Sequence, residues 1–356
     1  MADKVRVTVV LPISPAMLES IRGVSDRLDV VSLSQMQRLV YRDGKPLWAG
    51  YAEPAPDGSE SEEDARAVVN GVLTETEVLL GNPVVPNDIL QRAPKLKLVQ
   101  LTSAGADRLI DSELARSDRV SVTTASGIHA VPIGEYVIGA MIAFAKGFPR
   151  AFRGQQENTW RPYIASELED ATVGILGLGA IGRHVAKLAK GFGMRVIATR
   201  RSQEKRMSGA AAGEQYVDEM FARDEIPVML GECDYVVVAV PLTEESRHLI
   251  GEAELSAMKR NAVIVNIARG AVIDQQALIR AVKNGVIGGA ALDVTDPEPL
   301  PPDNELWRLD NVMITPHISG GTPKYMDRAI ELFCDNLRRY LAGEPLRNLI
   351  DAERGY

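Results

Sequence analysis

Apolar and polar positions alternate in blocks along the chain, and the blocks predict strands and helices in turn. In the first third, short apolar runs predict strands at residues 5–11, 29–33, 77–80 and 96–101. Helical spacing covers residues 15–28, with Ser14 as the cap and Pro15 in the first turn, and also residues 87–92. The segment 50–63 is rich in Pro, Gly, Ser and acidic residues, which indicates an exposed excursion.

The rest of the chain carries a stronger pattern. Residues 130 to about 151 predict one long helix, charged over most of its length only at Glu135 and Lys146, and therefore buried between domains or subunits. Strands are then predicted at residues 172–178, 195–199, 235–240, 262–267, 289–294 and 312–315. A continuous apolar run such as 235–240 is typical of a strand buried on both faces, so the sheet is parallel and doubly wound. Helical periodicity returns at residues 323–341.

A glycine motif follows the first of these later strands. Gly177, Gly179 and Gly182 have the G-x-G-x-x-G spacing, with Ala180 and Ile181 between the last two. The first glycine permits a tight turn, the second leaves room for a pyrophosphate, and the third lets the next helix pack closely. A strand precedes the motif and a helix at 183–190 follows it, so the spacing predicts a dinucleotide site at a helix N-terminus.

The residues at the end of the next strand indicate which dinucleotide the chain binds. An NAD enzyme usually carries an acidic residue there, which accepts a hydrogen bond from the ribose 2′-hydroxyl. This chain has Arg200 and Arg201 instead, and an arginine pair would bind a 2′-phosphate. The sequence thus favours NADP(H), with NAD as an alternative. If the arginines form only a solvated strand end, the coenzyme preference would be weak.

These patterns predict an α/β protein of two doubly wound, parallel-sheet, Rossmann-like domains. Residues 125–318 form the dinucleotide-binding domain, and residues 1–124 with 319–356 form a discontinuous substrate domain. The chain would cross between them near Ser126 and Gly320, and a cleft would lie between the domains.

Composition narrows the class of protein. The chain has 356 residues, 46% of them hydrophobic and 25% charged, as in soluble globular proteins. Its net charge of −8 argues against nucleic acid as a partner. Cys233 and Cys334 are too few for a disulfide framework, and the apolar run at 136–145 is too short to cross a bilayer. A cytoplasmic protein with no membrane association is expected.

Three residues at strand ends could perform a reaction. Arg269, Glu298 and His317 each follow a predicted strand, on the edge where a doubly wound sheet places its active site. Reduction of a 2-oxo acid needs a hydride on the carbonyl carbon and a proton on its oxygen. A histidine can supply the proton, a carboxylate favours the imidazolium, and an arginine can hold the substrate carboxylate. No set of residues has metal-ligand spacing, so no metal is predicted.

The ordered motifs resemble the D-isomer-specific 2-hydroxyacid dehydrogenase family. The likeness rests on residues 177–182, 241–243, 266–270, 291–299 and 315–317. It implies that Arg269, Glu298 and His317 are catalytic and that the backbone at Ser103, Ala104 and Gly105 binds the substrate carboxylate. It also implies coenzyme contacts, to the nicotinamide end from Asp293 and along the groove from Val240, Pro241 and Ala268. The resemblance further implies a homodimer formed through the 130–151 helix.

The residues at the coenzyme end are similar to those of NADP-using glyoxylate/hydroxypyruvate reductases within the family. The expected function is therefore reduction of a small 2-oxo acid to a 2-hydroxy acid. The segment 203–216 is longer than usual, and Tyr136 stands where many relatives have His. Two alternatives stay open at this point. One is an enzyme of the same fold acting on phosphoglycerate or phosphite, and the other is a dinucleotide-sensing interaction protein like the dehydrogenase-shaped co-repressors.

Overall fold

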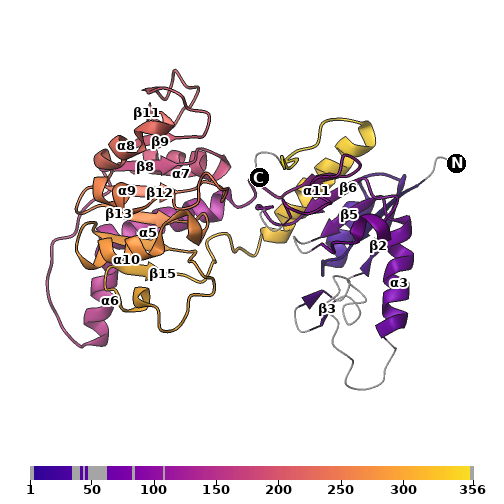
Figure 1. Cartoon of the computed structure of the whole chain (residues 1–356), viewed down its shortest axis with the longest axis horizontal. Coiled ribbons are helices and arrows are strands. Elements are labelled where there is room, and N and C mark those ends of the chain that lie inside the picture. The colour runs from indigo at the N-terminus through magenta and orange to yellow at the C-terminus, as the bar shows by residue number, and fades with distance from the viewer. Residues whose placement is uncertain are drawn as a thin grey trace. The chain divides into compact units, whose positions relative to one another are not determined.

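The computed structural model describes residues 4–33, 41–42, 45–46, 62–81, 85–106 and 109–352 (Figure 1). The chain folds into two compact units, each an α/β layer structure. Unit 1 comprises Met1–Ile128 and Pro323–Tyr356, and unit 2 comprises His129–Thr322. The predicted fold class is confirmed, because each unit has a predominantly parallel sheet with helices on both faces. The assignment of one unit to substrate and the other to coenzyme stays a proposal.

Unit 1 is built on a five-stranded sheet with the order β2-β1-β5-β6-β7, parallel throughout. Its strands are β1 (Val5–Val9), β2 (Leu28–Ser32), β5 (Val78–Gly81), β6 (Leu98–Leu101) and β7 (Ser121–Thr123). One face packs on α1 (Pro15–Arg22) and α11 (Tyr325–Ala342), and the other on α3 (Glu62–Glu75) and α4 (Ile89–Arg92). A short antiparallel pair joins β3 (Tyr41–Arg42) and β4 (Lys45–Pro46).

Helix α1 begins as its sequence predicts. The Ser14 hydroxyl accepts a hydrogen bond from the Met17 N–H at 3.3 Å, and Pro15 occupies the first turn. The predicted end at residue 28 is wrong, because the helix stops before Gly23 and Leu28 already opens β2. Helix α3 was not predicted. The expected excursion at 50–63 lies outside the described residues up to residue 61, and residues 62–63 belong to α3.

Unit 2 is built on an eight-stranded sheet with the order β10-β11-β9-β8-β12-β13-β14-β15. The central strands are β8 (Thr172–Leu176), β9 (Arg195–Thr199), β12 (Tyr235–Val238), β13 (Val263–Asn266), β14 (Gly289–Leu292) and β15 (Val312–Ile314). The short edge strands are β10 (Met207–Ser208) and β11 (Glu219–Met220). All pairs are parallel except β10 with β11, so the purely parallel sheet that the sequence predicted is wrong at this one edge.

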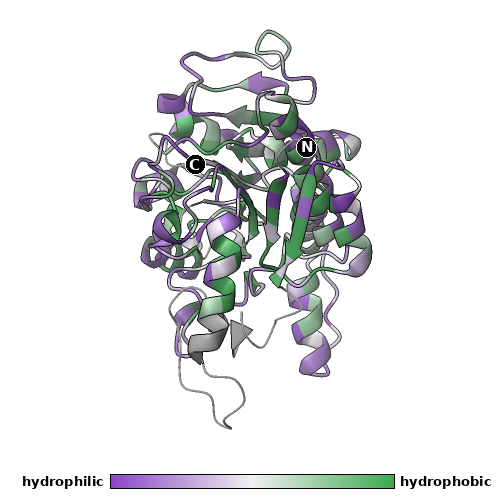
Figure 2. Ribbon diagram, turned by 90° about the vertical axis from the view of Figure 1, so that its right-hand side faces the viewer, coloured by the Kyte–Doolittle hydropathy of each residue, from purple (hydrophilic) through white to green (hydrophobic). Residues whose placement is uncertain are grey.

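Alternate residues of each central strand enter opposite cores, which explains the continuous apolar runs. In β12, Val236 and Val238 pack toward α8 (Ile226–Glu232), α9 (Glu252–Ala257) and α10 (Gln275–Lys283). Val237 packs on the other face, toward α5 (Ala130–Ala145) and α7 (Ala180–Gly191). Strands coloured mainly as hydrophobic are visible in Figure 2, in which unit 1 faces the viewer. Three short 3-10 turns complete the unit: η3 (Arg223–Glu225), η4 (Gly270–Val272) and η5 (Glu305–Arg308).

The single long helix predicted for residues 130–151 is wrong. Helix α5 ends at Ala145, and a second helix, α6 (Phe148–Gln156), begins after Gly147. Gly147 has a left-handed φ of +67°, and a Cβ there would lie 2.6 Å from the Tyr163 ring, so only glycine fits this corner. Within the described residues no single helix has the length and apolarity to span a bilayer, and α5 and α6, which reach that length together, are bent by 65°.

The strand order of unit 2 fixes where a ligand can bind. Strand β8 lies between β9 and β12, so the connections leaving β8 and β12 run to opposite sides of the sheet. In doubly wound sheets this reversal opens a crevice at the carboxyl ends of the two strands. The glycine motif follows β8 and residues 239–241 follow β12, so both lie at that point.

Candidate active site

The glycine motif forms the turn that a dinucleotide requires. Gly177 has φ +99°, and a Cβ there would lie 2.6 Å from the Ala239 carbonyl oxygen and 2.9 Å from Cγ1 of Val240. A Cβ on Gly182 would lie 2.2 Å from the Gly177 carbonyl oxygen, so the start of α7 packs directly on the turn. Gly179, by contrast, faces open space, with no atom within 4 Å of such a Cβ. These three environments fit a pyrophosphate over the N-terminus of α7.

The walls beside this turn come from β12 and β13. Val240 is half-buried and Pro241 is exposed, and the Pro241 carbonyl accepts a 2.6 Å hydrogen bond from the Ser246 hydroxyl, which fixes this corner. Ala268 is buried at the end of β13. The structure therefore places the three predicted groove residues just after the carboxyl ends of two neighbouring strands, while their contact with a coenzyme stays a prediction.

Arg200 and Arg201 follow β9, as predicted, and both form ion pairs within the protein. Arg200 Nη1 donates to Oε1 of Glu214 at 2.8 Å, and Arg201 Nη2 donates to Oε1 of Glu245 at 3.0 Å. Arg183, on the first turns of α7, donates twice to the same Glu214 at 2.8 and 2.9 Å. Sequence reasoning missed Arg183 and Glu214, since their contact joins residues 31 positions apart.

The arginines retain the character of an anion site. Among buried side-chain polar atoms of the described residues, Nε of Arg200 and the hydroxyl of Thr199 have no hydrogen-bond partner. Both lie where β9 ends, at the position that recognises the adenosine ribose in dinucleotide folds. The residues present thus fit a ribose that carries a 2′-phosphate.

His317 and Glu298 meet in the structure. Nδ1 of His317 lies 2.6 Å from Oε1 of Glu298, and both side chains are close to half exposed. The backbone of His317 has a left-handed φ of +54°, and its N–H donates to the carbonyl oxygens of Asp293 and Thr315. With Nδ1 held by the carboxylate, the opposite ring nitrogen, Nε2, faces away from Glu298 and can carry the proton that a reaction consumes.

A buried carboxylate anchors the turn that carries His317. Asp293, only 1% exposed, accepts hydrogen bonds from the Thr315 hydroxyl at 2.6 Å and from the N–H groups of Ile318 and Ser319 at 2.9 Å. Tyr136 on α5 in turn bonds the Thr315 hydroxyl at 2.8 Å. Since the single proton of Thr315 goes to Asp293, Tyr136 must be the donor. Burial raises the pKa of Tyr136 to about 12, so it remains protonated at neutral pH.

Arg269 lies on the loop after β13. Its Nη1 donates to the Ala268 carbonyl oxygen at 2.8 Å, and the Asn266 side-chain amide donates to the carbonyl oxygen of Arg269 at 3.0 Å. The next residue, Gly270, packs so closely on the Thr295 peptide that a Cβ would lie 2.0 Å away. This contact joins the Arg269 loop to the loop that carries Glu298, so the structure brings the loops of the three predicted catalytic residues to one edge of the unit 2 sheet.

The predicted carboxylate-binding residues lie in unit 1. Ser103, Ala104 and Gly105 follow β6 and are all half-buried. The Ser103 hydroxyl donates to the Gly105 carbonyl at 2.8 Å, and the Ser103 carbonyl accepts from the Ala125 N–H at 2.8 Å. These bonds define the turn, and its role in binding substrate stays a prediction.

The other histidines have structural surroundings. The His184 ring packs on α5, 2.5 Å from where a Cβ of Gly134 would stand. The His129 ring lies 2.9 Å from where a Cβ of Gly320 would stand, and His248 is exposed in a turn. Across the described residues, no group of three or more His, Cys, Asp or Glu side chains could hold a metal ion.

Comparison with known proteins adds to this geometry. The family model for the D-isomer specific 2-hydroxyacid dehydrogenase, NAD binding domain, matches residues 138–319. A glyoxylate reductase of Korarchaeum cryptofilum is 34% identical over 318 residues, covering 86% of this chain and 89% of that protein. A glyoxylate reductase of Thermococcus litoralis is 35% identical over 306 residues, covering 82% and 89%.

A solved structure agrees over the whole chain. The crystal structure of a D-isomer specific 2-hydroxyacid dehydrogenase from Xanthobacter autotrophicus Py2, in complex with NADPH and MES, has a TM-score of 0.78. It is 29% identical and covers 100% of both chains. The similarity therefore extends beyond the dinucleotide unit to the full length.

Proposed function

Because this chain belongs to the D-isomer-specific 2-hydroxyacid dehydrogenase family, we propose that it reduces a small 2-oxo acid to the D-2-hydroxy acid. Glyoxylate and hydroxypyruvate are the substrates we favour, since relatives covering most of the chain are glyoxylate reductases. The observation that carries the proposal is the 2.6 Å contact of His317 with Glu298 at the edge of the sheet. The names of these relatives disfavour a dinucleotide-sensing role.

We propose NADP(H) as the preferred coenzyme, with NAD(H) as a weaker one. The glycine turn would hold the pyrophosphate, and Arg200 with Arg201 would bind the 2′-phosphate. The Xanthobacter relative binds NADPH. When bound, the coenzyme supplies the hydride that adds to the substrate carbonyl carbon.

The side chains of unit 2 would supply the rest of the chemistry. His317 donates a proton from Nε2 to the carbonyl oxygen as that oxygen becomes an alcohol. Glu298 accepts the Nδ1 hydrogen bond, which orients the ring and stabilises the protonated imidazolium. Asp293 fixes the turn on which His317 stands.

Arg269 and the Ser103 turn would hold the substrate. A guanidinium can form two parallel hydrogen bonds to a carboxylate, and it can also polarise the adjacent carbonyl. The bond from Arg269 to the Ala268 carbonyl orients the plane of the guanidinium. We assign the second grip on the carboxylate to the backbone N–H groups of Ser103, Ala104 and Gly105.

Oxidation of NADPH at 340 nm tests the function, with glyoxylate, hydroxypyruvate, pyruvate and longer 2-oxo acids as substrates. His317→Asn should lower kcat at least about a hundredfold, as the loss of a general acid does. Asparagine tolerates the left-handed backbone of this site. His248→Asn is the matched control, because His248 is exposed and has a similar φ of +52°. Equal activity of the two variants would refute the assignment of His317.

We propose that the chain acts as a homodimer. Four large apolar side chains on α6 and the segment after it are exposed: Phe148 41%, Phe152 61%, Trp160 95% and Ile164 100%. Such a group typically marks a protein interface, and a second copy of this chain would cover it. Light scattering should give twice the chain mass, and Trp160→Asp with Ile164→Asp should give the single mass. We also propose a cytoplasmic location, consistent with two buried thiols that form no disulfide.

A further inference from the structure

Glu214 bridges two arginines at the coenzyme end of unit 2. Its Oε1 accepts from Arg200 at 2.8 Å and from Arg183 at 2.8 Å, and its Oε2 accepts from Arg183 Nε at 2.9 Å. The Glu214 side chain is 8% exposed, whereas those of Arg183 and Arg200 are 51% and 31% exposed. The hydrogen bonds from Arg183 hold the pKa of Glu214 below its usual range, so the carboxylate is charged at neutral pH.

The segment that carries Glu214 is held in a fixed position. Gly209 packs on the Val217 carbonyl, where a Cβ would stand 1.7 Å away, and the Gly209 carbonyl accepts the Glu214 N–H at 2.8 Å. Strand β10, inside the segment, pairs with β11 at the sheet edge. The position of the carboxylate is therefore set by the fold and not by a mobile side chain alone.

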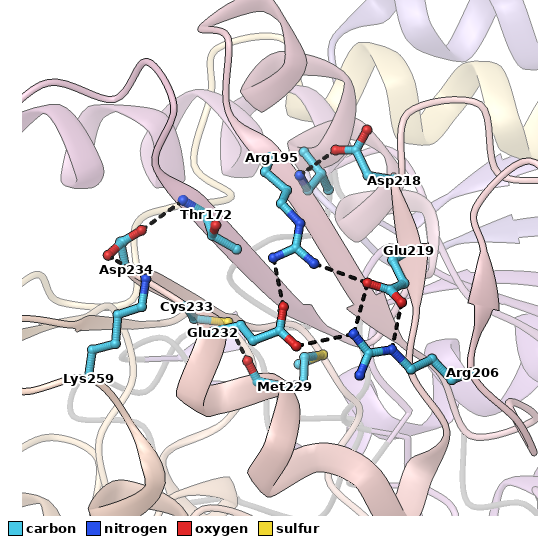
Figure 3. Close-up of polar contacts among 11 residues, drawn as sticks. Thr172, Arg195, Arg206, Asp218, Glu219, Met229, Glu232, Cys233, Asp234 and Lys259 are labelled. Atoms are coloured by element: carbon cyan, nitrogen blue, oxygen red, sulfur yellow. Dashed lines mark hydrogen bonds and ion pairs between the residues drawn. The ribbon is translucent and has the colours of Figure 1, made fainter.

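A ring of ion pairs anchors the same segment at its start. Arg206 donates to Glu219 at 2.6 and 3.0 Å and to Glu232 at 3.1 Å, and Arg195 donates to the same two carboxylates at 3.0 and 2.7 Å (Figure 3). The Arg206 guanidinium also stacks 3.9 Å from the centroid of the Phe221 ring. A closed ring of two arginines and two glutamates fixes β10 to the strands beside it more firmly than one exposed pair would.

The position of this carboxylate has a consequence for the coenzyme. Arg200 directly follows β9, where the ribose of a dinucleotide is recognised. A 2′-phosphate that binds Arg200 would have to share this guanidinium with the Glu214 carboxylate, which already accepts hydrogen bonds from Arg200 and Arg183. On the basis of the proposed coenzyme, we propose that Glu214 is an intramolecular counter-anion that competes with the 2′-phosphate and sets the degree of preference for NADP over NAD.

The formal charges around Glu214 support its role in the preference for NADP over NAD. Arg183, Arg200, Arg201 and Arg223 are paired with two glutamates, Glu214 and Glu245, which leaves a formal excess of two positive charges among these six residues. A phosphate dianion would neutralise that excess. Removing Glu214 alone should therefore strengthen phosphate binding and leave the adenosine contacts in place.

Direct binding tests this without turnover. We would measure dissociation constants by calorimetry for 2′,5′-ADP and 5′-AMP, in wild type and in Glu214→Gln, and take the ratio of the two affinities. The ratio should rise about tenfold or more in the variant, since a charge-assisted competitor is removed. Glu204→Gln, which removes an exposed charge from the same segment, is the matched control and should leave the ratio unchanged.

A second variant covers the case in which Glu214→Gln does not fold. Glu214→Asp keeps the charge but shortens the reach to the two arginines, so its ratio should lie between those of wild type and Glu214→Gln. A ratio that is unchanged or lower in the folded variants overturns the inference. The wild-type ratio tests the proposed coenzyme separately. A wild type with no preference for 2′,5′-ADP would contradict that coenzyme, whereas a rise in the ratio on substitution of Glu214 would still support the role of Glu214.

Discussion

The hydroxyl of Thr315 is the link between α5 and the turn that carries His317, so Thr315→Val should both destabilise unit 2 and reduce turnover. Valine has the same shape but neither donates to Asp293 nor accepts from Tyr136. The buried carboxylate of Asp293 would lose one of the three hydrogen bonds described above, the shortest of them at 2.6 Å. The Tyr136 hydroxyl would lose the oxygen to which it donates.

The size of the effect follows from these two losses. A hydrogen bond to a charged group contributes about 1.5 to 3 kcal/mol, and a partly buried hydroxyl left without a partner costs about 1 kcal/mol more. The free energy of unfolding should fall by about 2 to 4 kcal/mol, which corresponds to a drop in Tm on the order of 5 to 10 °C for a unit of this size. Turnover should fall because the Asp293 carboxylate binds the Thr315 hydroxyl before His317 and the N–H groups of Ile318 and Ser319 after it, and so positions His317.

Scanning calorimetry of the intact chain, with kcat measured in parallel, is the assay. Thr315→Ser keeps the hydroxyl and should lose less than about 1 kcal/mol. Adding Tyr136→Phe to Thr315→Val removes the unpartnered phenol, so the double variant should recover about 1 kcal/mol. Two results would refute this reasoning. One is an equal Tm for Thr315→Val and Thr315→Ser, and the other is a double variant whose loss of unfolding free energy is the sum of the losses of the two single variants.

Three further predictions follow from the structure. Burial raises the pKa of Tyr136 and of Cys233 to about 12, above 10.0 and 9.0 in the unfolded chain. Urea midpoints should therefore be nearly constant between about pH 7 and pH 9 and fall from there toward pH 12, and midpoints that stay constant from pH 9 to pH 12 would contradict the burial of these groups. Gly182→Ala should lower the free energy of unfolding by about 2 kcal/mol, because its Cβ would meet the Gly177 carbonyl, whereas Gly179→Ala should leave it unchanged and weaken dinucleotide binding. The reverse pattern would refute the assignment of the glycine turn. Arg206→Met should loosen the segment 203–216 and speed amide hydrogen exchange there, and unchanged exchange would mean that the ion-pair ring does not anchor it.

Local chemistry made much of the fold predictable. Strand β9 begins and ends where its apolar pattern predicts, at Arg195 and Thr199, and Ser14 caps α1 as expected. The glycine motif was also predictable, because each of its three glycines meets a different steric requirement of the turn. The break between α5 and α6 could also have been predicted, because Gly147 is followed by a proline in the first turn of α6, but the continuous apolar pattern favoured a single helix.

The candidate site was predictable only in part, because its decisive contacts are non-local. Each of Glu298 and His317 is marked by its place after a strand, but their 2.6 Å contact depends on two loops 19 residues apart. Tyr136 and Thr315, 179 residues apart, gave no shared pattern in the sequence. Glu214 lies in a segment of low regularity, so its pairing with the arginines could be seen only in three dimensions.

The stereochemistry of the product tests the central claim most directly. Hydroxypyruvate would be reduced with NADPH, and the glycerate formed would be resolved by chiral chromatography. The account predicts the D-enantiomer, formed by the wild type and lost in His317→Asn. Formation of the L-enantiomer, or no product from any 2-oxo acid in the presence of tightly bound NADPH, would contradict it.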